Sequence, residues 1–327
     1  MSSNHVVRVL DRLVGLGGQA LYAGVRAGVR QFLPGLPLLE TVPDGRMIEL
    51  PGRGRTFVVD VAGPSQSAPT VVLLHSLGCT AYLSWAATLG ELSRHYRVIT
   101  FDQRWHGRGI RSERFAFSDC AEDVVAVMNY LDVERALVAG YSMGGAVAQL
   151  VWRRHPHRVT GLVLCSTARN FRGNHGERVF FPMMTAAMHP LSSYALARVD
   201  RLAQHLPELP TVEVSNMPSW GGIEFRSTSA WSFPEVIGEL GRFNSAPWID
   251  RVNVPAAVVV TENDWAIPAR RQRRLAAAIP GSEIFTAPGG HASIFLDAKN
   301  WIPVFVGAVN DVAQRVQGRE AGQTAAN

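Results

Sequence analysis

The chain has 327 residues, of which 47% are hydrophobic and 18% are charged, a composition typical of one large globular domain with or without an insertion. Its net charge of +5 comes from arginines that are spread along the chain without a nucleic-acid-binding motif, so we expect no nucleic-acid partner. The apolar stretches are shorter than the roughly 18 residues of a membrane span, and the N-terminus lacks a secretion-signal pattern. We therefore expect a cytoplasmic protein. Three widely spaced cysteines without metal-ligand spacing predict reduced, structural thiols: Cys79, Cys120 and Cys165.

Residues 1–45 are expected to form a helical N-terminal arm. On a helical wheel, five polar side chains of this arm gather in one arc roughly 40° wide. They are Arg8, Arg12, Gln19, Arg26 and Arg30. The rest of the wheel is mostly apolar, which leaves two interpretations. The arm either packs on the body of the protein with its arginines in solvent, or lies on an anionic membrane as a peripheral contact.

From residue 46 onward, strand and helix patterns alternate. The stretches "MIEL" and "RTFVVDVAG", joined by "PGRG", predict a hairpin. Short apolar runs rich in β-branched residues predict buried strands at 70–75, 96–102, 135–140, 159–166 and 254–261. The stretch 282–290 is expected to be the last strand. Helical patterns occupy 82–94, 118–131, 143–155, 268–279 and 292–315. This alternation predicts an α/β fold with a mostly parallel central sheet and helices on both faces.

The alternation is interrupted once, between residues 169 and 250, where no strand of this kind occurs and Met, Phe, Trp and Pro are frequent. A segment of this length is too long for an ordinary loop, so we expect a helical cap inserted between two sheet strands. The core is then divided into residues 46–168 and 251–315. The polar tail, 316–327, is expected to be disordered.

The stretch "LVAGYSMGGAV" (137–147) places Ser142 between Gly140 and Gly144, where a predicted strand meets a predicted helix. A lone G-x-S-x-G spacing is a weak signal, but this context is the one that a nucleophilic serine needs. Catalytic groups of parallel sheets collect at the carboxyl ends of the strands. Asp264 follows the strand at 254–261, and His291 follows the strand at 282–290.

The order Ser142, Asp264, His291 is that of the α/β-hydrolase triad. In such a triad the histidine removes the serine proton and the carboxylate orients the histidine. The main-chain N–H groups of Leu77 and Met143 are the candidate donors to the oxyanion. Glu262 is the rival to Asp264 as the acid.

Several stretches resemble α/β-hydrolase fold enzymes of the esterase and lactonase kind over about residues 46–312. They are "LLHSLG", "FDQRWHGRG", "GYSMGG", "LVLCSTA", "TENDWAIP" and "GGHASIFLD". The resemblance implies the fold and the serine triad. The chain departs from the family where Ser76 replaces a glycine and where Trp105 and Gly109 stand in the D-x-R-G-H-G-x-S run. Ser76 either adds a hydroxyl near the oxyanion or simply fits the turn.

Other candidate residues surround this set. His75 and His106 are expected to organise loops beneath the site rather than to react. Cap residues that either line an apolar substrate pocket or form ordinary core are Met183, Met184, Met188, Trp220, Phe225 and Trp231.

The sequence thus predicts a serine carboxylic-ester hydrolase that acts on a small-molecule ester or lipid with an apolar acyl group. The pattern implies no metal and no organic cofactor. An enol-lactone hydrolase is the nearest alternative, because "HSLG", "GYSMGG" and "LVLCSTA" are similar to stretches in those enzymes. Thioesterases, perhydrolases and C–C hydrolases use the same triad, and some non-catalytic binding proteins share the fold.

Overall fold

The computed structural model describes residues 42–172, 177–179, 183, 186, 224, 227–228 and 232–326. The predicted N-terminal arm therefore lies outside the described residues, except for 42–45. Most of the predicted cap also lies outside them, including Met184, Met188, Trp220, Phe225 and Trp231. The two interpretations of the arm and the assignment of these cap residues stay predictions.

The described residues form one eight-stranded sheet in the order β1-β2-β4-β3-β5-β6-β7-β8. Only β1 and β2 run antiparallel to their neighbours, and all other pairs are parallel. The strands are β1 (Gly45–Leu50), β2 (Gly54–Val61), β3 (Thr70–Leu74), β4 (Arg97–Phe101), β5 (Ala136–Tyr141), β6 (Val159–Cys165), β7 (Ala256–Thr261) and β8 (Glu283–Ala287). The predicted hairpin, the five predicted buried strands and the predicted last strand, β8, are all present.

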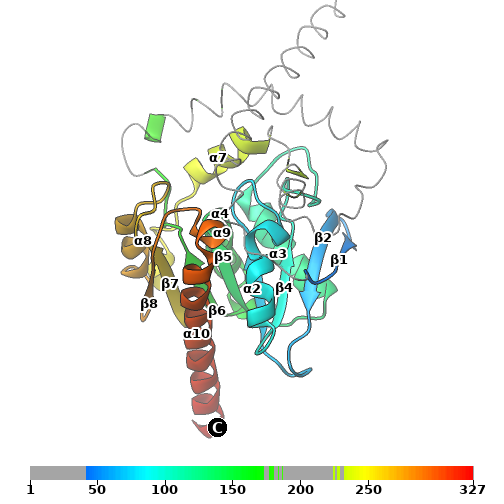
Figure 1. Ribbon diagram of the computed structural model, residues 1–327, viewed down its shortest axis with the longest axis vertical. Helices are drawn as coiled ribbons and strands as arrows, with labels where there is room; N and C mark the ends of the chain where they lie inside the picture. Colours follow the sequence, from blue (N-terminus) through cyan, green and yellow to red (C-terminus); the bar gives the residue numbers. More distant parts are fainter. Residues whose placement is uncertain are drawn as a thin grey trace, which may run out of the picture.

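Helices cover both faces of the sheet (Figure 1). One face carries α3 (Phe117–Tyr130), α4 (Met143–Arg154) and α8 (Ala269–Ala276), and the other carries α2 (Ala81–Leu92), α9 (Ser293–Leu296) and α10 (Ala298–Ala326). Alternate residues of each strand enter the two apolar layers. In β3, Val72 and Leu74 face the first set of helices, whereas Val71 and Leu73 face the second. The predicted α/β fold with a mostly parallel sheet is confirmed.

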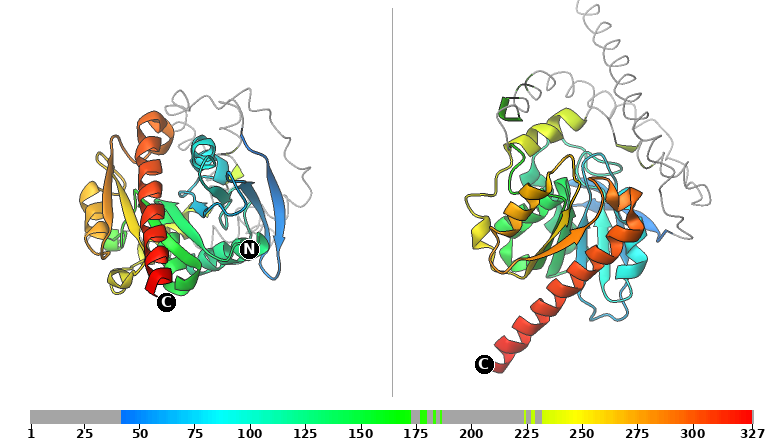
Figure 2. Two further views of the ribbon diagram at one scale, coloured as in Figure 1. Left: turned by 90° about the horizontal axis from the view of Figure 1, so that it is seen from below. Right: turned by 60° about the vertical axis from the view of Figure 1, so that its left-hand side comes forward.

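The segment between β6 and β7 starts and ends at one place. Asn170 forms an isolated antiparallel bridge with Asn244, and the N–H of Ser245 donates to the carbonyl of Arg169 at 2.7 Å. The last described helix of this segment is α7 (Phe233–Arg242), which lies beyond the carboxyl edge of the sheet (Figures 1 and 2). The two ends of the segment are thus hydrogen-bonded to each other, which is compatible with an inserted cap. Two short 3₁₀ turns, η2 (Pro156–Arg158) and η4 (Ile249–Arg251), precede β6 and β7.

The C-terminal prediction was wrong in two respects. The helix expected at 292–315 is divided at Asp297 into α9 and α10, and α10 continues through the tail that was expected to be disordered. Arg315 explains part of the extension. Its guanidinium donates to the carbonyls of Ala256 (2.7 Å) and Gly281 (3.0 Å), which lie at the amino ends of β7 and β8. Figure 1 and the right-hand view of Figure 2 show α10 continuing past the sheet.

Two further findings concern expectations from composition. The three cysteines are free and buried, as expected for structural thiols. Within the described ranges, no helix is both long enough and apolar enough to cross a membrane.

Candidate active site

Among the three residues predicted as a triad, His291 lies within hydrogen-bond distance of each of the other two. His291 Nε2 is 3.0 Å from Ser142 Oγ, and His291 Nδ1 is 2.8 Å from Asp264 Oδ2. Ser142 follows β5, Asp264 follows β7 and His291 follows β8, so three carboxyl ends of the sheet supply one residue each. The parallel sheet therefore brings together residues that are up to 149 positions apart in sequence.

Ser142 stands in a tight turn between β5 and α4. Its φ of 54° and ψ of −111° lie in a region that residues with a Cβ rarely adopt. The flanking glycines are required by close approach, since a Cβ at Gly140 would come within 2.2 Å of the Gly144 carbonyl oxygen. The N–H of Ser142 donates to Cys165 O, and Thr167 Oγ1 donates to Ser142 O, both at 2.8 Å. These bonds to the end of β6 hold the strained turn in place.

Asp264 is the acid that contacts the histidine. Its Oδ2 accepts from His291 and, at 3.1 Å, from the side-chain amide of Gln272 on α8. Its Oδ1 accepts the N–H groups of Ala266 (2.9 Å) and Ile267 (2.7 Å). The rival, Glu262, is exposed and lies 3.6 Å from Arg273 instead. The carboxylate of Asp264 is therefore buried, fixed by four donors, and aimed at the imidazole.

The two predicted oxyanion donors, Leu77 and Met143, belong to different elements. Met143 is the first residue of α4, where main-chain N–H groups have no partner inside the helix. Leu77 lies in the loop after β3. Within the described residues neither N–H donates a hydrogen bond to an oxygen, so both are available to a ligand. The ring of Phe233, at the start of α7, lies against the neighbouring Gly78, whose φ is +74°.

The two departures from the family pattern have different structural reasons. Ser76 has no positive φ, so the turn accepts its Cβ, and its hydroxyl donates only weakly to Leu77 O at 3.5 Å. Trp105, in contrast, has a φ of 65°, a conformation that a glycine would adopt without strain. Its indole is buried, and its Nε1 donates to Ser112 O at 3.1 Å. This packing holds the strained residue.

His75 and His106 are fully buried and connect neighbouring loops. His75 Nε2 accepts the N–H of Gln103 at 2.8 Å, and His75 Nδ1 donates to Ser76 O at 2.8 Å. Burial lowers the pKa of His75 to about 4. Burial, followed by the nearby His75, lowers the pKa of His106 to about 3. Both rings are therefore neutral at pH 7, and the first of them ties the Leu77 loop to the segment after β4.

Several residues of the site were not predicted from the sequence. Trp265 is 78% exposed, and its ring packs edge-on against His291 with centroids 6.1 Å apart. Tyr141 Oη donates to His291 O at 2.8 Å. Both lie one residue from a triad member, and this adjacency to Asp264 and Ser142 was the available signal. Gln272 and Phe233 gave no signal, because only the fold brings them to the site.

The assembled groups can perform nucleophilic acyl transfer. A hydroxyl lies beside an imidazole, a buried carboxylate holds that imidazole, and two main-chain N–H groups are free nearby. Of the predicted pocket residues, Ser76 is nearly buried, whereas Met183 is largely exposed. Within the described ranges, no group of three or more His, Cys, Asp or Glu side chains could hold a metal ion.

Known proteins with similar sequences and folds were then compared with the chain. A family model described as alpha/beta hydrolase fold matches residues 69–198. The magnesium-chelatase 30 kDa subunit of Rhodobacter capsulatus is 29% identical over 249 residues, which are 72% of this chain and 84% of that protein. The 3-oxoadipate enol-lactonase 1 of Acinetobacter baylyi is 36% identical over 96 residues, which are 29% of this chain and 35% of that protein.

Among solved structures, the enol-lactonase from Burkholderia xenovorans LB400 superposes with a TM-score of 0.62 at 23% identity. The match covers 81% of this chain and all of that one. At this identity the likeness concerns the fold, and it agrees with the strand order described above. The matching family model and the matching structure agree that the chain has the α/β-hydrolase fold.

Proposed function

We propose that the chain is a serine hydrolase that cleaves carboxylic esters through an acyl-enzyme formed on Ser142. The observation that carries this proposal is the pair of contacts made by His291, 3.0 Å to Ser142 Oγ and 2.8 Å to Asp264 Oδ2. Asp264 accepts a hydrogen bond from the N–H at Nδ1, which leaves Nε2 unprotonated and able to take the proton of the serine hydroxyl.

The reaction follows from this arrangement. Ser142 Oγ attacks the ester carbonyl carbon while its proton moves to His291 Nε2. The negative charge that develops on the carbonyl oxygen is met by the N–H groups of Leu77 and Met143. His291 then gives its proton to the departing alkoxide, which leaves as the alcohol. Water, activated by His291, attacks the acyl-enzyme, and the acid is released with Ser142 restored.

Hydrolysis of an enol-lactone is a second candidate. Two of the matched proteins are named enol-lactonases, and a lactone is a cyclic ester that the same groups can open. The exposed ring of Trp265 beside His291 offers an apolar edge to either substrate. The two candidates differ only in whether the leaving alcohol stays attached to the acyl group.

Labelling tests the nucleophile, and a substrate panel tests the ester class. A fluorophosphonate probe should modify Ser142, and Ser142→Ala should lose both labelling and hydrolysis while remaining folded. The panel consists of p-nitrophenyl esters of increasing chain length beside a set of lactones. Modification of a different serine would refute the assignment of Ser142. An intact chain that neither reacts with the probe nor hydrolyses any panel member would instead indicate a binding protein.

A further inference from the structure

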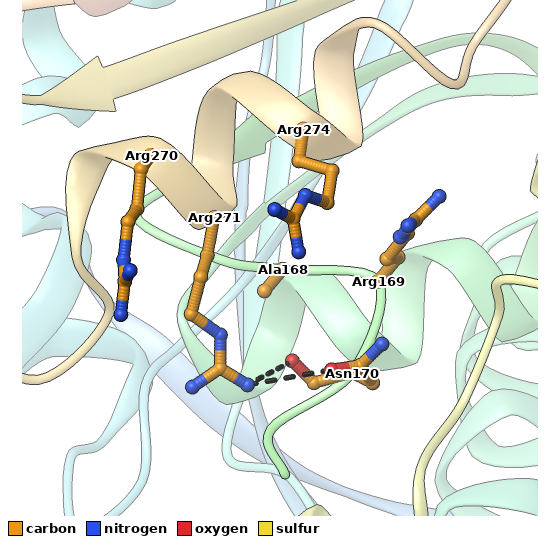
Figure 3. Close-up of a pocket in the computed structure, with 6 residues that line it drawn as sticks. All are labelled: Ala168, Arg169, Asn170, Arg270, Arg271 and Arg274. Carbon is orange, nitrogen blue, oxygen red and sulfur yellow. Dashed lines mark hydrogen bonds between the residues drawn. The ribbon is translucent and has the colours of Figure 1, made fainter. Parts of the chain in front are cut away.

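A pocket of about 280 Å³ lies between the first turns of α8 and the segment that follows β6. It is lined by Ala168, Arg169, Asn170, Arg270, Arg271 and Arg274 (Figure 3). Among these six described residues, four are arginines and none is a carboxylate. Arg271 and Arg274 project from α8 toward the segment that carries Arg169 (Figure 3). The pocket shares no lining residue with the Ser142 site.

Only one of these arginines is neutralised by a carboxylate. Arg271 Nη1 lies 3.2 Å from Glu177 Oε2, and its Nη2 donates to Asn170 O at 2.6 Å. Across the described ranges, Arg169, Arg270 and Arg274 form no ion pair. The Nε of Arg169 is buried and has no hydrogen-bond partner. Four arginines line the pocket and one of them is paired with a carboxylate, which leaves a local excess of positive charge.

The position of the arginines on α8 adds to this imbalance. Arg270 and Arg271 lie in the first turn of the helix, at the positive end of its dipole, and the turn contains no acidic residue. Arg270 and Arg274 are four positions apart, so they lie on one face of the helix and repel each other. On the same helix, Arg273 is 3.6 Å from Glu262, away from the pocket lining. An anion bound in the pocket would be attracted both to these arginines and to the positive end of the helix dipole, and so would offset the repulsion between them.

We propose that this pocket binds the phosphate group of a small phosphorylated molecule. Guanidinium groups pair with phosphate oxygens through two parallel hydrogen bonds, and a dianion offsets more of the excess charge than a carboxylate does. The main-chain N–H groups at the start of α8 favour the same charge. The volume leaves room for a phosphate and a small organic body. The site is independent of the proposed ester hydrolysis.

Calorimetric titration of the full-length chain with inorganic phosphate tests the site. Sodium chloride at matched ionic strength gives the reference for general charge screening. Saturable binding with a dissociation constant of about 1 mM or lower is expected. Arg169→Gln/Arg274→Gln should weaken binding by about tenfold or more, because it removes two donors of the pocket. Arg273→Gln is the matched control, since it removes a charge from α8 outside the pocket and should bind phosphate as the unmodified chain does.

Three further measurements identify the source of the phosphate and test whether phosphate binds at the active site instead. Glycerol phosphate should compete with inorganic phosphate if the ligand is a small soluble molecule. Sedimentation with phosphatidic-acid vesicles, lost in the double variant, would instead assign the same phosphate chemistry to a lipid headgroup. Chain that has been blocked at Ser142 with the fluorophosphonate should still bind phosphate.

Three results would overturn the proposal. They are phosphate binding no stronger than that of chloride, a double variant that binds as tightly as the unmodified chain, and loss of binding on blocking Ser142. Circular dichroism and the melting temperature of the double variant show whether it is folded. The substituted arginines lie at the surface or at its edge, so the fold should be retained.

Discussion

Asp264 uses both carboxylate oxygens, and the direction of each bond bears on catalysis. The two N–H groups that reach Oδ1 belong to the turn before α8, so they fix the position of the carboxylate. Oδ2 is shared by Gln272 and His291, and this contact leaves only Nε2 of the imidazole facing Ser142. A neutral amide at position 264 would keep the shape of the group but could donate to Nδ1, which favours the wrong tautomer of His291.

Asp264→Asn is therefore expected to lower kcat by about 10⁴-fold, as replacement of the triad carboxylate does elsewhere. Glu262→Gln serves as the control, because Glu262 is exposed and contacts Arg273 rather than the imidazole. Its kcat should change little. Steady-state hydrolysis of one p-nitrophenyl ester by the two variants is the measurement. If the Glu262 variant lost activity and the Asp264 variant kept it, the carboxylate would be wrongly assigned.

The buried histidines give a prediction about stability in acid. Unfolded His106 takes up a proton near a pKa of 6.5, whereas burial lowers the pKa of the folded residue to about 3. Between these values the unfolded state binds more protons, so the free energy of unfolding falls as pH falls through this window and is fully present above about pH 6.5. A difference of one in pKa corresponds to about 1.4 kcal/mol, so the expected loss amounts to several kcal/mol.

Urea denaturation at pH 7 and pH 5 measures this effect. His106→Gln lacks the titrating ring, so its free energy of unfolding should fall less between the two pH values than that of the unmodified chain. His157→Gln is the matched control, because His157 is exposed. If the free energy of unfolding depended on pH equally in the unmodified chain and the His106 variant, the ring would take up its proton as easily in the folded state as in the unfolded state.

At the scale of elements, strands were the easiest part to predict. A parallel strand that is buried on both faces needs only a short run of residues such as "TVVLL" or "AAVVVT", and these runs are recognisable without knowledge of their neighbours. The triad followed from the strands, because their carboxyl ends meet at one edge. The extension of α10 was not predictable in this way, since it depends partly on contacts of Arg315 with distant main-chain carbonyls.

The sequence pattern also did not predict the contact between the loop after β4 and the segment that joins β6 to β7. Arg108 lies 3.2 Å from Asp102 Oδ2 and 3.0 Å from Glu224 Oε2, and both carboxylates are almost fully buried. Thr80 Oγ1 donates to the same oxygen of Glu224 at 2.6 Å. Burial raises the pKa of Glu224, whereas Arg108 and the hydrogen bond from Thr80 act in the opposite direction.

Arg108→Met should consequently destabilise the protein by about 3–5 kcal/mol, the usual result of leaving a buried charge without its partner. Arg94→Met is the comparison, because Arg94 forms an exposed pair with Glu91 at 2.9 Å that is worth about 1 kcal/mol or less. Urea unfolding at pH 7 gives both values. Adding Glu224→Gln to Arg108→Met should recover part of the loss. Equal losses for the two single variants would mean that Arg108 is not needed to hold the buried carboxylates.

At the scale of the whole molecule, α10 is the longest described helix, and its two halves have different surroundings. Its first half packs on the sheet and on α2, where Trp301 and Phe305 are fully buried. Gly161 of β6 allows the close approach of Val312, because a Cβ there would lie 2.4 Å from Val312 Cγ1. Beyond Val316, the residues up to 322 are exposed. The helix thus stops contributing to the apolar core at about this point.

Two truncations test this boundary. A chain that ends at Val316 loses the bond from Arg319 to Asn253 O and the exposed pair of Arg135 with Glu320, so its free energy of unfolding should fall by about 1 kcal/mol or less. A chain that ends at 310 also loses the buried Val312 and the two carbonyl contacts of Arg315, and it should fall by several kcal/mol, since one buried valine alone contributes about 1.5–3 kcal/mol. Urea denaturation of both truncated chains is the measurement. If the shorter chain were as stable as the longer one, α10 would hold the sheet only through its first three turns.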